Sequence, residues 1–417
     1  MVSKSDRVKN ITAIAVCAVM LAFVIIRAVT MLITYDEAYT YTECALTMSL
    51  TPRGIWELYR TSNSNNHMLN TLLIALIDRL TGIKYVEWVI RIPNILAAMV
   101  YLASSCYMYI KRHITAVPFY VLVTAYYVNE FFTFARGYGL AVCFMTLAFY
   151  MYILWQEGGY EKDSYPAWIL ILYALACTAN TICLLIAPVF GLVCIYRLIK
   201  SGRISGFLKS YWWAAVIAVI VIFAMLLYHI RVSQMIDGVQ YAVNESNYFE
   251  AFFANFGSMI IDYPVVDEAE GAGIILLIVL NIYFVIVKAK KCPVFTLTFI
   301  SIALIVLAMG IMGGDGFYTG RVMVPLFVLI PFMRLELDEE IEGRLAIGKY
   351  LTMIACAGLV SASLAQMRLD DTREFSSSQE TKEAAYEATD LYDYDGFYIT
   401  VFKYYYDEAQ YLRSLEE

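Results

Sequence analysis

The 417-residue sequence predicts an all-α protein that crosses a membrane many times. Its residues are 61% hydrophobic and only 16% charged, and the mean hydropathy is +0.63. A soluble domain of this length could not bury so much apolar surface. Apolar stretches of roughly 17–25 residues recur along the chain, the length that a helix needs to span a hydrocarbon core of about 30 Å.

We expect about eleven spanning helices. The first follows Lys4, Arg7 and Lys9, but it is longer than a signal-peptide core and lacks an A-x-A-like cleavage site, so we expect it to be retained. The expected spans are 10–33, 87–110, 115–134, 138–156, 166–180, 181–199, 211–230, 272–289, 293–313, 321–335 and 346–365.

The stretch 66–80 has the periodicity of a helix but not the length of a span. Its apolar residues form one stripe, while His67, Asn70 and Asp78 lie on the other face. Fifteen residues rising about 1.5 Å each reach roughly 22 Å, which is short of a bilayer. We therefore expect a helix that lies in the membrane interface. The stripe consists of Leu69, Leu72, Leu73, Leu76, Ile77 and Leu80.

The distribution of Lys and Arg predicts the orientation. With the N-terminus in the cytoplasm, the basic linker RLIKSGRISGFLK at 197–209 and most other Lys and Arg residues fall on the inner side, as the positive-inside rule requires. The outer side then receives the loops 34–86 and 231–271 and the tail 366–417. We expect a transmembrane domain over 1–365 in the bacterial cytoplasmic membrane, with an extracytoplasmic C-terminus. Aromatic residues in the 231–271 loop suit a lid on the lipid headgroups.

The tail 366–417 carries the acidity of the protein. It contains 5 Lys and Arg and 13 Asp and Glu residues, a net charge of −8 against −7 for the whole chain. The stretch YDYDGFYITVFKYYY at 392–406 is rich in aromatic and β-branched residues, so we expect one or two strands that pack on the outer face. The nine cysteines lie mostly in apolar segments, which argues against a disulfide framework or a zinc cluster.

Two adjacent carboxylates, Asp36 and Glu37, lie in the stretch TYDEAYTY directly after the first span. A solvated acidic pair at the end of a helix is the ordinary interpretation. Three arginines expected at the same rim favour a functional one. Arg91 opens an apolar span, where a charge is costly unless it reaches water or an anion. Arg136 and Arg321 are expected at the same level, and a glycine-rich stretch adjoins each.

Guanidinium groups at this depth suit an anionic phosphate carried on a lipid tail. When a sugar leaves a polyprenyl phosphate, the phosphate gains about one negative charge, which fixed guanidinium groups stabilise most in the transition state. Asp36 can take the proton of an acceptor hydroxyl that attacks the anomeric carbon. A base on one face of the sugar and a phosphate clamp on the other imply inversion. Glu37 either shares the catalytic role or holds an arginine.

The order of these motifs resembles that of the polyprenyl-phosphate-dependent GT-C glycosyltransferases. The motifs are TYDEAYTY, SNSNNHMLNTLL, the R-x-P of Arg91 and Pro93, ARGYGL, and a glycine-rich loop ending in Arg321. The closest branch is glycosyltransferase family 39, which includes protein O-mannosyltransferases and the bacterial aminoarabinose transferase. The resemblance covers about residues 10–365. It implies a GT-C-type bundle, Asp36 as the base and Arg91 as a ligand of the lipid phosphate.

The chain departs from that family at the start of the interfacial helix. Many members have His-Pro-Pro-Leu there, whereas this chain has His67-Met68-Leu69-Asn70. It also lacks the large soluble inserts of the eukaryotic protein O-mannosyltransferases. The acceptor is therefore open between a lipid, a glycan and a protein.

Further polar and aromatic residues at the outer rim are candidates for substrate binding. The alternatives are a cap or a neighbour contact for His67 and an interfacial aromatic belt for the tyrosines. Glu130 and Asp315 are expected to pair with Arg136 and Arg321. The candidates are Asn66, His67, Asn70, Tyr138 and Tyr318.

The donor is expected to be a lipid-linked sugar. Asp36 and Glu37 could ligate a divalent ion, but no third ligand follows by spacing, so we predict no metal site. The chain carries no nucleotide-binding fingerprint, and we expect membrane lipids rather than nucleic acid as its partners. The main alternative function is a transporter or flippase of a lipid-linked or anionic substrate, because buried arginines also line substrate paths.

Overall fold

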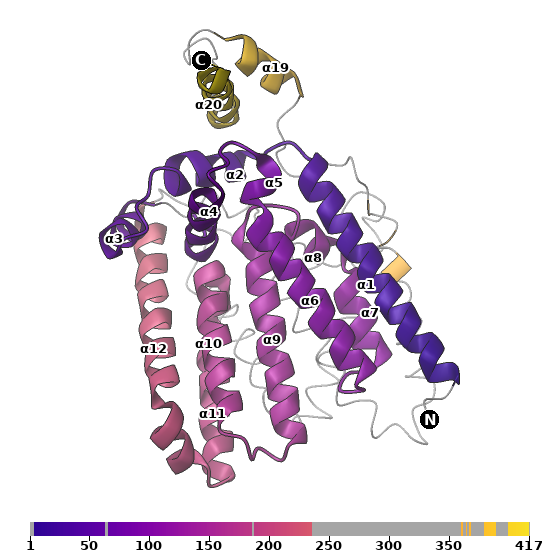
Figure 1. Cartoon of the computed structure of the whole chain (residues 1–417). Coiled ribbons are helices and arrows are strands. Elements are labelled where there is room, and N and C mark those ends of the chain that lie inside the picture. Colours follow the sequence, from indigo (N-terminus) through magenta and orange to yellow (C-terminus); the bar gives the residue numbers. More distant parts are fainter. Residues whose placement is uncertain are drawn as a thin grey trace, which may run out of the picture.

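The computed structural model describes residues 4–62, 66–185, 187–235, 379–388 and 399–416, together with residues 360–361, 364 and 367. Every regular element in these ranges is a helix, which agrees with the predicted all-α class (Figure 1). The expected spans at 272–289, 293–313 and 321–335, nearly all of the one at 346–365, and the 231–271 loop after Met235 lie outside the described residues. So do Tyr318, Arg321 and Asp315.

Four of the described helices are long and apolar enough to cross a membrane. They are α1 (Lys4–Thr30), α6 (Ile92–Ile110), α9 (Gly137–Glu157) and α12 (Ile204–Met235). The shorter helices α10 (Ser164–Ala179) and α11 (Ala187–Lys200) lie among them (Figure 1). Helix α9 forms the centre of the described helices. In its most apolar 18-residue stretch, 72% of the residues are buried, compared with 22% in the corresponding stretch of α12.

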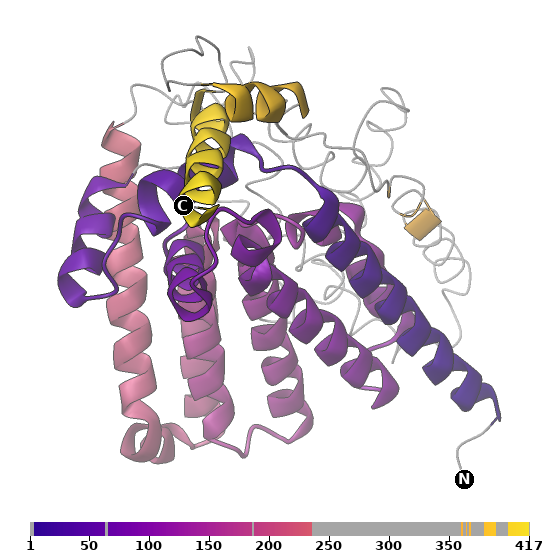
Figure 2. The ribbon, with the colours of Figure 1, turned by 45° about the horizontal axis from the view of Figure 1, so that its top comes forward.

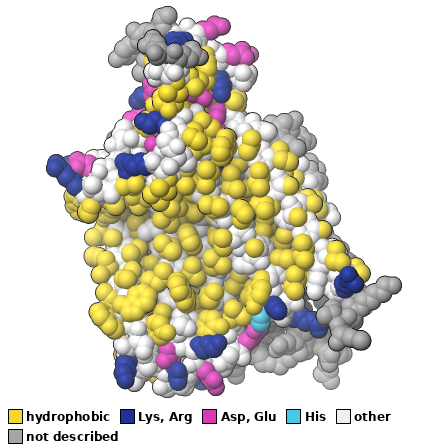
Figure 3. Space-filling model, in the orientation of Figure 1, with side chains coloured by type: hydrophobic (Ala, Val, Ile, Leu, Met, Phe, Trp, Pro, Cys, Tyr) yellow, Lys and Arg dark blue, Asp and Glu magenta, His cyan; other side chains and the backbone are white. Residues whose placement is uncertain are grey.

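Hydrophobic side chains cover the middle of the face seen in Figure 3, between two ends that carry charged residues. On α12, Val219, Ile220 and Phe223 are all exposed. Exposed apolar side chains over the full length of a helix are what contact with lipid requires. The surface therefore agrees with the four long helices in indicating a membrane protein.

Two of the expected spans are not continuous helices. In 87–110, α5 (Glu87–Ile90) is separated from α6 by Arg91, and Pro93 stands in the first turn of α6, where its missing N–H removes no helical hydrogen bond. In 115–134, α7 (Ala116–Thr124) and α8 (Tyr126–Phe131) are separated by Ala125, which has φ −54° and ψ 114°. The Asn129 side-chain amide donates to the Val123 carbonyl at 2.9 Å and so satisfies a group that the break frees. It also donates to the Ala125 carbonyl at 2.8 Å, which accepts the Asn129 backbone N–H as well.

The residues between α1 and α5 form short helices at one end of the bundle (Figures 1 and 2). They are α2 (Tyr35–Tyr39), the π-helix η1 (Thr40–Ala45), α3 (Pro52–Thr61) and α4 (Met68–Thr81). Helix α4 confirms the helix expected at 66–80. Its Asn70 and Thr71 are fully buried, while Leu76 and Leu80 of the leucine stripe are exposed. The buried side of α4 consists of Met68, Asn70, Thr71, Ile74 and Ala75, so two polar residues of this helix face the protein while the end of the leucine stripe faces outward.

The tail contains helices where we expected strands. Helix α19 (Gln379–Glu387) packs against α20 (Ile399–Glu416), and α20 includes the ITVFKYYY part of the predicted strand region. The strand prediction was wrong for this part, because it relied on the aromatic and β-branched composition and not on the spacing of the apolar residues. The buried residues of α20 recur every three or four positions, which places them on one face of a helix. They are Val401, Phe402, Tyr404, Tyr405, Glu408 and Ala409.

The tail helices pack on the short helices at the end of the bundle. The Tyr404 ring lies 5.8 Å from the Tyr41 ring and 5.7 Å from the Tyr85 ring, in edge-on geometry. Lys382 of α19 lies 3.5 Å from Glu87 and 3.9 Å from Glu408. Two carboxylates thus share one lysine at the contact between the tail and the bundle.

Gly137 permits a close approach at the start of α9. A Cβ atom there would overlap the carbonyl oxygen of Ala179, at the end of α10, and would lie 2.7 Å from the Cβ of His67. Gly139 is similarly close to Phe132 and Asn94. These glycines let the backbone of α9 touch its neighbours.

Gly137→Ala is expected to destabilise the protein by about 1–3 kcal/mol, because backbone atoms of α10 must move to admit the methyl group. Gly191→Ala is the matched control. No atom lies within 4 Å of a Cβ built at Gly191 of α11, so this change is expected to be neutral or stabilising by up to about 1 kcal/mol. Thermal unfolding in detergent micelles measures both. Equal melting temperatures for the two variants would contradict the close approach.

The docking of the tail is expected to depend on pH through Glu408. Burial raises the pKa of this carboxyl to about 7, with Lys382 lowering and Glu87 raising it, and Tyr386 of α19 also faces it. A carboxyl with a raised pKa in the docked state favours docking when protonated. The preference is complete below the ordinary pKa of 4.5 and is lost as the pH rises to about 7.

We expect docking to weaken by about 1–3 kcal/mol over this range, and Glu408→Gln to remove the dependence. Hydrogen exchange of the α20 amides, corrected for the intrinsic effect of pH, measures the docking. A wild-type pH profile in the Gln variant would show that another group is responsible.

Candidate functional site

The Asp36–Glu37 stretch begins α2 directly after α1 has ended. Thr34 caps this helix, since its hydroxyl accepts the Glu37 N–H at 3.3 Å and the Glu37 carboxylate accepts the Thr34 N–H at 3.0 Å. This reciprocal arrangement is a capping box, and its T-x-x-E signature was present in the sequence. The capping box turns Glu37 inward.

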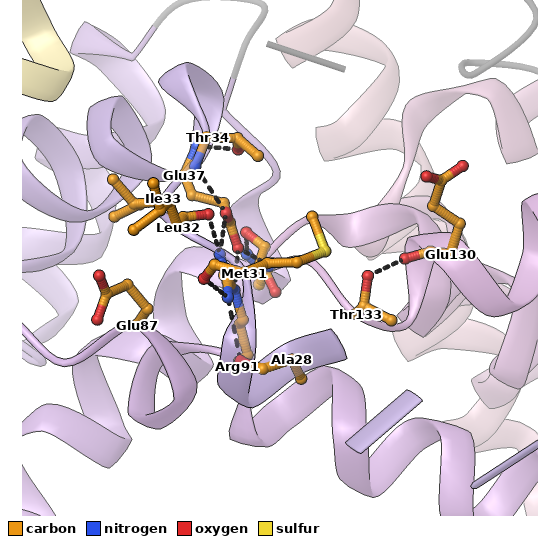
Figure 4. Close-up of polar contacts among 12 residues, drawn as sticks. Ala28, Met31, Leu32, Ile33, Thr34, Glu37, Glu87, Arg91, Glu130 and Thr133 are labelled. Atoms are coloured by element: carbon orange, nitrogen blue, oxygen red, sulfur yellow. Dashed lines mark hydrogen bonds and ion pairs between the residues drawn. The ribbon is translucent and has the colours of Figure 1, made fainter. Parts of the chain in front are cut away.

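Glu37 forms a fully buried ion pair with Arg91. Nε of Arg91 donates to Oε1 at 2.8 Å, and Nη2 donates to Oε2 at 2.8 Å. The remaining N–H groups of Arg91 donate to the carbonyls of Ala28, Met31 and Leu32, at 3.0, 2.7 and 2.9 Å (Figure 4). All five N–H donors of the guanidinium are therefore engaged within the protein.

Burial alone raises the pKa of Glu37, but the Arg91 charge and the hydrogen bonds it accepts hold that pKa below the ordinary value. Glu37 is thus kept ionised and in place. The geometry leaves Arg91 no N–H group for the phosphate contact we expected of it, and it leaves Glu37 holding an arginine, one of the two alternatives for that residue.

A chain of hydrogen bonds continues from Glu37 to three other elements. Oε1 of Glu37 accepts the Ala135 N–H at 2.6 Å, and the Ala135 carbonyl accepts from the Asn70 amide at 2.6 Å. The Asn70 side-chain oxygen accepts from Asn94 of α6 at 2.8 Å. The segment that precedes α9 is therefore held by α2 on one side and by α4 on the other. The side chain of Asn70, a predicted substrate contact, bonds here to other parts of the protein.

Asp36 and Arg136 form the more accessible pair of the site. Nη2 of Arg136 lies 3.1 Å from Oδ2 of Asp36, and the Asp36 side chain is 18% exposed, whereas the Glu37 side chain is 0% exposed. The guanidinium stands 5.6 Å from the centre of the Tyr138 ring. The His67 ring lies edge-on to Tyr138 at 4.7 Å. The structure thus brings together Asp36, Arg136, Tyr138 and His67.

Two further predicted residues have partners inside the protein. Nδ1 of His67 lies 3.0 Å from the carbonyl oxygen of Ala179, at the end of α10. The Asn66 side-chain oxygen accepts from the Thr71 hydroxyl, and the Asn66 carbonyl accepts from the Tyr228 hydroxyl at 3.2 Å. Asn66 is buried and ties the start of α4 to α12.

A second buried ion pair was missed at the sequence level. Glu130 pairs with Arg27 of α1 at 2.9 Å, instead of the expected Arg136, and also accepts from the Tyr126 hydroxyl at 2.8 Å. Both charged side chains are almost fully buried. The available signal was the presence of opposite charges in two apolar segments, since buried charges in membranes pair with one another.

The chemistry of the site follows from these contacts. Within the described part of the chain, no three His, Cys, Asp or Glu residues gather as metal ligands. Comparisons of the chain with protein-family models, curated proteins and solved structures find no match. A partly exposed carboxylate can bind a cationic or hydroxyl group, and the guanidinium beside it can bind an anion. The carboxylate can also move a proton between the two bound groups.

Glu37→Ala is expected to destabilise the protein by about 3–5 kcal/mol, because it leaves the Arg91 charge buried without its partner. Glu43→Ala is the matched control, since Glu43 pairs with Lys403 at 2.7 Å and both side chains are more than one third exposed. An exposed pair contributes less than about 1 kcal/mol. Denaturant titration in detergent micelles measures both variants. Similar decreases in the free energy of unfolding for the two variants would show that the buried Arg91–Glu37 pair contributes no more to stability than an exposed pair.

Proposed function

We propose that the protein is an integral-membrane inverting glycosyltransferase that transfers a sugar from a polyprenyl-phosphate donor to an acceptor hydroxyl at the outer face of the membrane. The observation that carries the proposal is the pair of Asp36 and Arg136, 3.1 Å apart, at the end of a bundle with an apolar surface. A lipid-anchored donor presents its phosphate where such a bundle meets water.

Asp36 is the general base in this mechanism. It takes the proton of the acceptor hydroxyl while the hydroxyl oxygen attacks the anomeric carbon, and the bond between that carbon and the phosphate oxygen breaks. The leaving phosphate gains about one negative charge, which the guanidinium of Arg136 stabilises. In this proposal Arg136 contacts both Asp36 and the phosphate. One displacement on the face opposite the phosphate inverts the configuration.

Arg91 and Glu37 are positioning residues in this proposal. Their hydrogen bonds fix both the start of α2, which carries Asp36, and the backbone of Ala135, which precedes Arg136. Tyr138 and His67 lie next to Arg136 and are proposed to contact the donor. Arg321 and Tyr318 remain proposed substrate contacts on the resemblance to GT-C enzymes alone.

A transporter or flippase of a lipid-linked or anionic substrate is the second candidate. It is favoured by the buried pair of Arg27 and Glu130, because intramembrane charges often mark a substrate path. The two candidates differ in the fate of the donor. A glycosyltransferase cleaves the sugar from the lipid phosphate, whereas a flippase moves the intact lipid across the membrane.

Asp36→Asn is expected to reduce turnover by roughly 10²–10⁴, because the amide keeps the shape of the side chain but cannot accept the proton. The measurement is release of polyprenyl phosphate from purified protein given a panel of radiolabelled hexosyl and pentosyl polyprenyl phosphates. Glu57→Gln removes an exposed carboxylate of α3 that pairs only within its own helix among the described residues, and it is expected to retain full turnover. Donor movement into vesicles without cleavage, at equal rates in wild type and Asp36→Asn, would favour the flippase.

A further inference from the structure

The C-terminal helix α20 lies across the short helices that carry the site (Figure 2). Its Tyr404 and Tyr405 are fully buried, and Tyr404 packs between Tyr41 and Tyr85 of the loop between α1 and α5. Lys403 pairs with Glu43 at 2.7 Å. The tail is therefore packed into the outer end of the bundle through rings and charges, although it is the last part of the chain.

Tyr405 contacts the backbone three residues before Asp36. Its hydroxyl accepts the Ile33 N–H at 3.1 Å and donates to Oε1 of Glu87 at 3.3 Å. Ile33 lies three residues after Thr30, the last residue of α1, and is fully buried. A buried N–H beyond the end of a helix needs a partner from elsewhere, and Tyr405 supplies it.

Four consecutive residues before α2 are thus held by side chains from other parts of the chain. Arg91 holds the carbonyls of Met31 and Leu32, Tyr405 holds the N–H of Ile33, and Glu37 holds the N–H of Thr34. Arg91 and Glu37 belong to the buried ion pair itself. Tyr405 comes from the C-terminal helix, 372 positions away from Ile33 in the sequence.

Lys382 of α19 holds the Tyr405 anchor in place. Its ammonium group lies 4.7 Å from the centre of the Tyr405 ring and 3.5 Å from Glu87, the acceptor of the Tyr405 hydroxyl. The phenol is therefore fixed from three sides, by the Ile33 amide, the Glu87 carboxylate and the Lys382 ammonium. Such a hydroxyl has one orientation, with its lone pair toward Ile33 and its proton toward Glu87.

We propose that Tyr405 is a positioning residue for Asp36 and that the C-terminal helix is part of the site. The hydroxyl fixes the point at which the chain leaves α1, three residues before Asp36, and thereby sets the distance from Asp36 to Arg136. The part of this inference that concerns turnover rests on the proposed glycosyl transfer. The part that concerns the order of residues 33–37 does not.

Tyr405→Phe tests the proposal, because it removes the hydroxyl and keeps the buried ring. Tyr411→Phe is the matched control, since Tyr411 lies on the same helix, its ring contacts Tyr85 at 5.9 Å, and its hydroxyl has no hydrogen bond within the described residues. Hydrogen exchange of the amides of residues 33–37 is expected to become roughly tenfold faster in Tyr405→Phe. In Tyr411→Phe it is expected to stay at the wild-type rate. Amides of α20 are expected to stay protected in both variants.

Turnover of a polyprenyl-phosphate sugar provides the second measurement. Tyr405→Phe is expected to lower kcat roughly ten- to a hundredfold at an unchanged KM for the donor, because a displaced base slows the chemical step and leaves donor binding intact. Wild-type exchange at residues 33–37 in Tyr405→Phe overturns the proposal, and so does faster exchange with an unchanged kcat. If wild-type protein has no transferase activity, the proposed function fails, and the exchange measurement alone then decides whether Tyr405 orders the segment.

Discussion

The buried ion pair of Arg91 and Glu37 is the interaction on which the end of the bundle that carries α2 depends. Two desolvated charges are tolerated only when further hydrogen bonds satisfy their remaining donors and acceptors. Here every N–H of Arg91 is used, and each oxygen of Glu37 accepts one bond from Arg91 and one from a backbone amide. These bonds join the end of α1, the start of α2, the break between α5 and α6, and the segment before α9. A shift of any one of these four segments strains the other three.

The same pair explains why neighbouring carboxylates have different roles. The capping box directs Glu37 into the protein, where its pKa is held low and where a proton on either oxygen would disrupt the two hydrogen bonds that this oxygen accepts. Asp36 is one residue earlier on the helix and therefore points elsewhere, toward Arg136, with part of its surface exposed. Because Ala135 bonds to Glu37 and the next residue pairs with Asp36, one short segment connects the anchor with the proposed base. The anchor sets the geometry of the base.

The sequence was sufficient for the helical class, for the helix at 66–80 and for the proximity of Asp36 to Arg136. It was not sufficient to separate Arg91 from Arg136, since both precede apolar helices. The difference lies in their partners, and only the T-x-x-E signature at Thr34 indicated that Glu37 would turn inward. The break at Ala125 leaves no mark in hydropathy, because only two polar groups, the Asn129 amide and the Tyr101 hydroxyl, donate to the carbonyls of Val123 and Leu122 beside it. In α20, composition favoured strands and spacing favoured a helix, and spacing is the better guide because it reports which side chains share a face.

The position of Asp36 is a property of the whole fold more than of the TYDEAYTY motif. Helix α2 has only five residues, too few to be stable alone in water, so the local sequence cannot hold the carboxylate in place. Its support comes from Arg91 and Tyr405, which lie tens to hundreds of residues away. The site in its full form therefore includes both the break at Arg91 and the C-terminal helix, packed on the end of α1. A motif of this kind marks where chemistry is possible, and the distant anchors decide which of its carboxylates is available for that chemistry.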